Sequence, residues 1–270
     1  MRTGTVKTAH AEVVVLRAIN YGERDKILTL YTREFGKVRA IAKGVRRTTS
    51  RMGGHLDLCG YATVLLVHGR NLEIVTQGRA LRTFPRLRDD LTAFSKACYA
   101  VELIDRFTED GDPNPELFRS LVRVLEHIET NARPTQALCL FMLQLLALSG
   151  YRPQLHHCVA CEAAIAPGDN AFDAALGGVL CPSCAPAHQA ARPIGVAALK
   201  FLRNLQRRGE DMLRMPVSPE ALAEAEAFLD LYVHHLLERR PHSASFRDIL
   251  RRDESAGAAS TAHVEHARPA

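Results

Sequence analysis

The clearest strand signal in the chain lies at residues 26–43, which read KILTLYTREFGKVRAIAK. Two runs rich in apolar and β-branched residues flank a Phe-Gly turn, a pattern typical of a β-hairpin. Because strand side chains alternate between faces, four residues share one face of the second strand: Lys37, Arg39, Ile41 and Lys43. This hairpin predicts a sheet whose outer surface is basic.

Strand-like segments flank the hairpin on both sides. They are residues 12–17, 61–67 and 72–77, and turns at 20–23 and 68–71 separate them from their neighbours. Five short strands with a turn roughly every ten residues favour a small closed barrel of the OB type. We therefore expect residues 1–82 to form an OB-fold domain, whose DNA-binding role depends on the charge and the resemblance described below.

The period of the apolar residues changes from two to about 3.6 near residue 88, which indicates helices. The helical pattern covers five segments: residues 91–104, 117–128, 134–148, 196–208 and 219–237. The predicted fold class is thus α+β, a five-stranded OB-type barrel followed by an α-helical domain over residues 83–252. The tail at 253–270 is rich in Ala, Ser and His, and we expect it to be disordered.

Two cysteine pairs give the strongest chemical signal. Cys158-Val159-Ala160-Cys161 is followed, nineteen residues later, by Cys181-Pro182-Ser183-Cys184. Each C-x-x-C loop lets two thiolates converge on one ion, and two loops complete a closed tetrahedral shell. We predict one structural zinc ion in an inserted zinc finger at residues 153–190, with four ligands: Cys158, Cys161, Cys181 and Cys184.

Other interpretations of the cysteines stay open at this point. His156, His157 or His188 could replace one cysteine, although surface histidines are the simpler interpretation. A redox C-x-x-C site is less favoured, because two pairs are present and no thioredoxin-like βαβ pattern surrounds them. The remaining cysteines lie among apolar neighbours and are expected to be core thiols: Cys59, Cys98 and Cys139.

Positive charge is concentrated in the front third of the chain. Residues 1–88 hold 17 Lys and Arg against 6 Asp and Glu, whereas the remainder holds 18 against 24. Such a field attracts polyanions, nucleic acid above all, although a solvated basic surface without a partner has the same composition. We predict that nucleic acid, and DNA if the resemblance described below holds, contacts six basic residues: Lys37, Arg39, Lys43, Arg46, Arg47 and Arg51. Tyr21, Tyr31 and Phe35 could stack on bases, although each is more typical of a core or rim position.

Motifs of catalysis are missing from the sequence. It has no phosphate-binding loop, Gly-rich dinucleotide turn or H-E-x-x-H helix. Glu220, Glu224 and Glu226 near the start of one predicted helix suit a solvated, dipole-favoured face better than acid–base chemistry. No stretch approaches the ~20 apolar residues of a membrane span, and the first residues lack a secretory signal. We expect a non-enzymatic protein of the cytoplasm.

Three segments, in order along the chain, carry a family signature. They are residues 21–47, residues 143–155 leading into Cys158, and Phe172 with the run 177–181. Together they resemble the RecO family of bacterial recombination mediators. The resemblance implies an OB domain, a helical domain and an inserted zinc finger. It also implies binding to single- and double-stranded DNA and annealing of complementary strands.

The resemblance further implies protein partners. These are RecR and single-stranded-DNA-binding protein, with which the family helps to load RecA onto coated DNA. The expected location is the cytoplasm, in association with the nucleoid. Two departures are visible, because Glu162 and Ala185 stand where family zinc knuckles often carry Gly. Composition alone leaves open an RNA- or ribosome-associated OB and zinc-ribbon protein, and an adaptor that binds only protein.

A second basic surface is predicted on the helix at 196–208. Lys200, Arg203 and Arg207 line one face. Beside them runs a predicted buried stripe: Val196, Leu199, Leu202 and Leu205. The resemblance implies that the tail of single-stranded-DNA-binding protein is acidic and ends in an apolar residue. We expect this face to hold that tail, although a solvated helix face is the simpler alternative.

Overall fold

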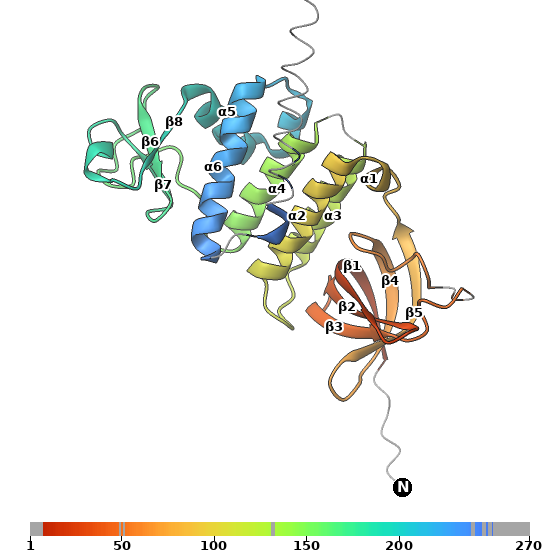
Figure 1. Cartoon of the computed structure of the whole chain (residues 1–270). Helices are drawn as coiled ribbons and strands as arrows, with labels where there is room; N and C mark the ends of the chain where they lie inside the picture. The colour runs from red at the N-terminus through yellow and green to blue at the C-terminus, as the bar shows by residue number, and fades with distance from the viewer. Residues whose placement is uncertain are drawn as a thin grey trace, which may run out of the picture.

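The chain folds into a β-barrel and a helical domain that carries a second, smaller sheet (Figure 1). The computed structural model describes residues 8–48, 50, 52–130, 133–238, 241–244, 247 and 250. The helices lie between the barrel and the small sheet, so the two β-structures stand at opposite ends of the molecule. This arrangement confirms the predicted α+β class, whereas the predicted disordered tail at 253–270 lies outside the described residues.

Five strands close the barrel in the order β1-β2-β3-β5-β4, as expected of an OB-type barrel. The strands are β1 (Thr8–Tyr21), β2 (Asp25–Thr32), β3 (Gly36–Ala42), β4 (Tyr61–Val67) and β5 (Glu73–Arg82). Neighbours pair antiparallel except β3 and β5, which are parallel. β1 is longer than the predicted 12–17, because its first half pairs with β4 and its second half with β2. A register shift between Val15 and Arg17 lets one strand serve both partners.

The barrel interior is filled by small and branched apolar side chains that alternate with outward-facing residues. All of the following are buried: Val13, Val15, Leu28, Leu30, Ala40, Ala42, Val64, Leu66 and Val75. Alternation therefore fixes which side chains of each strand face outward. That outward set includes Arg39 and Ile41 on β3.

In the described part of the chain, the helical domain packs five long helices around a common core, preceded by one short helix. The helices are α1 (Arg86–Asp89), α2 (Leu91–Phe107), α3 (Pro115–Thr130), α4 (Pro134–Leu148), α5 (Val196–Arg208) and α6 (Pro219–Leu237), with short 3-10 turns η1 (Ala185–Ala187) and η2 (Gly209–Arg214). Asp90 and Ser218 cap α2 and α6 by accepting backbone N–H bonds from Ala93 and Ala221. α4 is buried on most sides, because its sequence is apolar almost throughout. Among the residues that the structure describes, no helix combines the length and apolarity needed to cross a membrane.

The second sheet has three strands in the order β7-β6-β8 and lies against α6. The strands are β6 (Asn170–Asp173), β7 (Gly178–Leu180) and β8 (Arg192–Ile194). Phe172 is fully buried, and its ring centroid lies 3.9 Å from that of Phe228 and 5.4 Å from that of Tyr232, both on α6. The insert therefore shares the core of the helical domain.

A buried charge cluster joins the segment after α6 to the core. Arg247 is 1% exposed, pairs with Glu226 at 3.4 Å and with Asp230, and lies 3.7 Å above the Tyr99 ring. The expectation that Glu226 lies on a solvated face is therefore wrong. Its carboxylate is buried because an arginine distant in sequence compensates its charge.

Candidate metal centre and nucleic-acid interface

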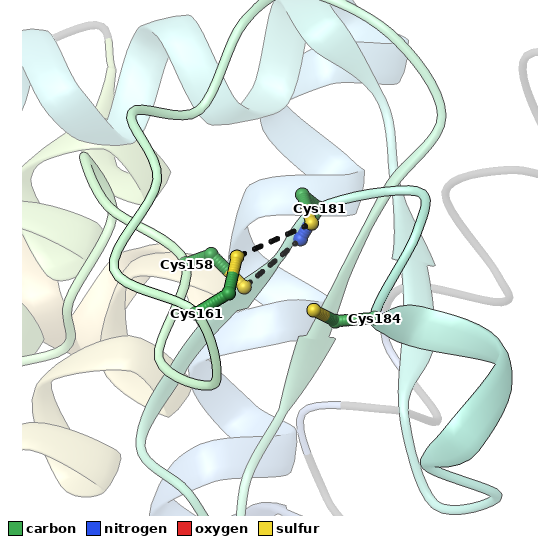
Figure 2. Close-up of side chains that lie close together, drawn as sticks. All are labelled: Cys158, Cys161, Cys181 and Cys184. Atoms are coloured by element: carbon green, nitrogen blue, oxygen red, sulfur yellow. Dashed lines mark hydrogen bonds between the residues drawn. The ribbon is translucent and has the colours of Figure 1, made fainter.

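Four cysteine thiols converge between the two C-x-x-C loops (Figure 2). The sulfur atoms of Cys158, Cys161, Cys181 and Cys184 all lie within 4.8 Å of one another, and those of Cys161 and Cys181 are 3.8 Å apart. A tetrahedral zinc–thiolate shell with bonds of about 2.3 Å places its sulfurs about 3.8 Å from each other. The four thiols are therefore spaced to hold one metal ion with little movement.

Backbone hydrogen bonds shape the first cysteine loop. The N–H of Cys158 donates to the Ala163 carbonyl, and the N–H of Glu162 donates to the Cys158 carbonyl. Glu162 closes the turn with a positive φ of 60°, so it occupies the position where a glycine would be more comfortable. Glu162 therefore forms the same turn that the glycine often found at this position would form.

Backbone donors also stabilise negative charge on the cluster. Burial alone would raise the pKa of Cys158, but N–H groups of Cys181, Ala160 and Cys161 lower it to about 6. Hydrogen bonds that the Cys184 thiol donates to the sulfurs of Cys181 and Cys161 raise its pKa to about 12. One thiolate thus opposes ionisation of its neighbours, and a bound cation would remove that repulsion. Such a site is chemically suited to a metal.

The nearby histidines take no part in the cluster among the described residues. His188 instead lies 3.6 Å from the Asp173 carboxylate. His156 and His157 are exposed on the loop before Cys158. Four thiolate ligands would complete a tetrahedral shell and leave no open position for a substrate.

The outer face of β1, β2 and β3 carries a row of basic residues. Arg17 on β1 lies opposite Thr29 on β2, which in turn lies opposite Arg39 on β3. Arg39 is exposed, as are Lys43, Arg46 and Arg47 in the loop that follows β3. The structure thus brings these four predicted residues onto or beside one face, whereas Arg51 lies outside the described residues. Sequence reasoning missed Arg17, and only the strand register reveals its place in the row.

An apolar row runs beside the basic one. Pairing along the sheet places one outward aliphatic residue on each neighbouring strand: Ile19, Ile27, Ile41, Ile74 and Val67. Ile19 is 53% exposed and the others are partly exposed. Strand pairing thus aligns five partly or fully exposed aliphatic side chains across the barrel exterior.

Lys37 has a different role from the other predicted DNA contacts. Its ammonium donates to the carbonyls of Asp105 and Thr108, both at 2.7 Å, and pairs with the Asp105 carboxylate at 3.5 Å. Arg17 also pairs with Asp105, at 2.8 Å. Lys37 therefore joins the barrel to the end of α2, and its charge is largely compensated there.

The three aromatic residues predicted to stack on bases differ in their exposure. Tyr31 is fully buried against Phe118, with ring centroids 6.1 Å apart, so it cannot stack on bases. Tyr21 and Phe35 are exposed. Only these two remain available for contact with a ligand.

The three predicted basic residues of α5 also differ: one is bonded within the protein and two are exposed. Arg203 donates to the backbone carbonyls of Leu155 and Ile165, so it holds the cysteine-bearing insert against the helix. Lys200 and Arg207 are exposed. The predicted buried stripe is wrong at Val196, which is 45% exposed as the first residue of the helix, whereas Phe201 is buried.

Comparison with known proteins places this architecture in one family. The model of the family described as Recombination protein O N terminal matches residues 6–84, and that of Recombination protein O C terminal matches residues 88–245. A protein of Roseiflexus sp. named DNA repair protein RecO is 39% identical over 241 residues, which cover 89% of this chain and 85% of that protein. Proteins of the same name from Dehalococcoides mccartyi and Anaeromyxobacter sp. (strain K) are 33% and 37% identical and cover 89% and 88% of this chain, and 95% and 94% of their own lengths. The chain therefore belongs to the RecO family, whose role is in DNA repair and recombination.

Proposed function

We propose that this protein is a non-enzymatic recombination mediator that binds single- and double-stranded DNA on the outer face of its barrel. Binding two single strands would let it anneal complementary sequences. With RecR, it would help to load RecA onto DNA coated by single-stranded-DNA-binding protein. Membership of a DNA repair family favours this function over the RNA- or ribosome-associated alternative.

The observation that carries the proposal is the pairing of a basic row with an apolar row on β1, β2 and β3. Arg39, Lys43, Arg46 and Arg47 provide cations that can pair with phosphates. The apolar row provides a surface against which bases can pack. Bases are accessible in a single strand but stacked inside a duplex. Duplex DNA would therefore use mainly the cations, whereas a single strand would use both.

The first experiment measures affinity for single-stranded and duplex oligonucleotides against salt concentration. Each phosphate contact releases condensed counterions, so the triple change Arg39→Ala, Lys43→Ala and Arg46→Ala should weaken binding to both forms and flatten the salt slope by about 2 to 3. Arg79→Ala is the control, since Arg79 is equally exposed but lies on β5, away from this face. An unchanged slope in the triple variant would place DNA elsewhere on the molecule.

The second experiment separates the two DNA forms. Ile27→Thr with Ile41→Thr keeps a β-branched residue on each strand and removes the apolar contact. Affinity for single strands should fall several-fold while duplex affinity stays the same. Leu65→Thr makes the matched change at an outward position of β4 outside the row. Equal losses for both forms would show that the isoleucines do not contact bases.

We also propose that the metal of the four-cysteine cluster is zinc. Tetrahedral thiolate coordination suits zinc, and the sulfur spacing fits its bond length. Elemental analysis of reduced, unchelated protein should find about one zinc per chain. A different metal, or none, would refute this assignment.

The acidic tail of single-stranded-DNA-binding protein is proposed to bind α5 through Lys200 and Arg207, with Arg203 serving to position the insert beside them. Arg207→Glu with Lys200→Glu should abolish binding to a tail peptide and leave binding to naked DNA nearly intact. Arg192→Glu on exposed β8 is the control. Unchanged peptide affinity in the double variant would move the tail to another surface.

The chain is proposed to divide into a barrel domain at 1–82 and a helical domain at 83–252, with the zinc-finger insert at 153–190. The separate family matches to residues 6–84 and 88–245 support the division. Limited proteolysis should release a fragment that ends between residues 82 and 88. Persistent cleavage inside the barrel would contradict these bounds.

A further inference from the structure

Two loops meet at one end of the basic face of the barrel. The first is the turn 22–24 between β1 and β2, and the second is the segment 43–47 that follows β3. Strand pairing brings them together, because Lys26 near the start of β2 lies opposite Ala42 at the end of β3. We call these two segments the loop pair.

The Asp25 carboxylate holds the second loop against the first. Asp25 is the first residue of β2, and its Oδ1 accepts a hydrogen bond of 2.7 Å from the backbone N–H of Gly44. Gly44 has a positive φ of 66°, a conformation that a residue with a Cβ adopts only at a cost. The chain therefore turns sharply after Lys43, at a point that Asp25 fixes.

Two further hydrogen bonds join the loops through Arg46. Its backbone N–H donates to the Arg24 carbonyl, and its Nη1 donates to the Gly22 carbonyl, both at 3.0 Å. The preceding residue, Val45, is 4% exposed and packs into the barrel interior. Residues 44, 45 and 46 thus each contact the barrel or its first turn, so the second loop is held along its length.

The loop pair concentrates positive charge. Four of its basic residues are exposed: Arg24, Lys43, Arg46 and Arg47. The Arg47 guanidinium group lies against the turn, because its Nε is 3.5 Å from the position that a Cβ on Gly44 would occupy. The nearby carboxylates are those of Glu23 and Asp25, and Asp25 is bonded to Gly44. Such an excess of cations favours the phosphates of nucleic acid.

We propose that Asp25 is a positioning residue of the DNA contact and that Arg24 is a further phosphate-binding residue. This inference rests on the proposed function, because it assumes that DNA binds the outer face of the barrel. Asp25 is an anion and repels phosphate, so it acts by holding the loop that carries Lys43, Arg46 and Arg47. Cations that are already held in place lose less conformational entropy when a strand binds.

Arg24 enters the contact through its place in the first loop. Its backbone carbonyl is bonded to the Arg46 N–H, so the two residues are adjacent across the loop pair. One strand can therefore contact both side chains. No alternation or spacing within the sequence indicates this, because the two arginines are brought together only by the pairing of β2 with β3.

The first test compares two substitutions at Asp25 in the full-length protein. Asp25→Asn and Asp25→Ala both remove the negative charge, but only asparagine keeps an oxygen that can accept the Gly44 N–H bond. Affinity for a single-stranded oligonucleotide is measured against salt concentration. Asp25→Ala should bind several-fold more weakly than Asp25→Asn, with a slope flatter by about 1, which corresponds to the loss of one to two phosphate contacts.

Hydrogen exchange separates positioning of the loop from stability of the barrel. The amides of Gly44 and Arg46 should exchange faster in Asp25→Ala than in Asp25→Asn, whereas those of β1 and β4 should stay protected in both. Equal affinities and equal slopes in the two variants would show that Asp25 does not position the DNA contact.

The second test removes Arg24. Arg24→Ala should flatten the slope for a single strand by about 0.7, the effect of one phosphate contact. Arg33→Ala is the control, since Arg33 is also exposed but follows the opposite end of β2 and pairs with Glu12. An unchanged slope in Arg24→Ala would refute its role as a contact.

The triple variant Arg39→Ala, Lys43→Ala and Arg46→Ala distinguishes the two levels of failure. If it keeps the wild-type slope, DNA does not bind this face and the proposed function is wrong. If its slope is flattened while Asp25→Ala matches Asp25→Asn and Arg24→Ala matches the wild type, DNA binds this face and only the inference about the loop pair is wrong.

Discussion

The barrel and the β6-β7-β8 sheet are small β-structures at opposite ends of one helical domain, yet they are stabilised differently (Figure 1). The barrel closes on itself and buries its own core, in which Leu28 and Leu30 are fully enclosed. The smaller sheet has no core of its own. It depends on Phe172, which packs on α6, and on the thiol cluster at its edge.

This difference assigns a separate role to each region. A closed barrel buries its own core, so an outward row on the part of its exterior that the helices leave uncovered can be basic or apolar without weakening the interior. In the smaller sheet, the four cysteines and Phe172 serve local stability. We infer that the barrel carries the DNA contact and that the metal centre maintains the shape of the insert.

Loss of the metal should have the largest local effect. Structural zinc contributes apparent binding energies of about 10–16 kcal/mol in isolated zinc-finger peptides. Cys181→Ala should therefore release the metal and unfold the loops around Cys158 and Cys184. Hydrogen exchange should become fast between residues 158 and 184 and stay slow in β2 and β3. Unaltered exchange in the insert would mean that Phe172 alone holds it.

The matching change in the barrel is Leu30→Ala. Removing a fully buried leucine should lower the free energy of unfolding by about 2–5 kcal/mol. Zinc content should be unchanged, because the barrel and the insert lie at opposite ends of the helical domain. Ile19→Ala on the exposed row should cost less than about 0.5 kcal/mol in the same urea titration. A comparable loss in both variants would contradict the assignment of Leu30 to the interior.

The attachment of the insert depends on Arg203. Arg203→Met keeps the length of the side chain but removes its hydrogen bonds to the Leu155 and Ile165 carbonyls, at a cost of about 1–3 kcal/mol. Proteolysis between residues 155 and 165 should accelerate while the metal stays bound. Arg207→Met, on the exposed part of the same helix, should not have this effect.

The smallest expected effect is a pH dependence of stability that comes from Glu102 on α2, outside both the barrel and the smaller sheet. Burial would raise its pKa, but hydrogen bonds from Ser243, His242 and Arg106 outweigh burial and lower it. A carboxyl whose pKa is lowered on folding stabilises the fold above its unfolded pKa, and that stability is lost as pH falls through the folded value. Acid should therefore weaken docking of residues 241–244 by about 1 kcal/mol. In Glu102→Gln this pH dependence should disappear, as thermal melts between pH 3 and pH 7 would reveal.

Local sequence patterns were enough to predict the barrel, most of the helices and the cysteine cluster. Alternation in 26–43 and the spacing of the two C-x-x-C pairs act over few residues and need no knowledge of distant neighbours. Alternation also placed Arg39 and Ile41 on the outward side of β3.

Residues whose roles depend on distant partners could not be predicted in this way. Lys37 has the same local pattern as Arg39, but the end of α2 occupies its ammonium. Glu226 is buried in an ion pair with Arg247, which lies 21 residues further along the chain. The isoleucine row arises from strand register, which no single strand reveals.

The salt dependence of binding to a single-stranded oligonucleotide tests the division of roles most directly. It should be measured for the wild type, for the triple variant Arg39→Ala, Lys43→Ala and Arg46→Ala, and for Cys181→Ala. The account predicts a flatter slope and weaker binding in the triple variant, and a wild-type slope in Cys181→Ala despite its loss of metal. A normal slope in the triple variant together with a flattened slope in Cys181→Ala would place the DNA contact on the insert and contradict the account.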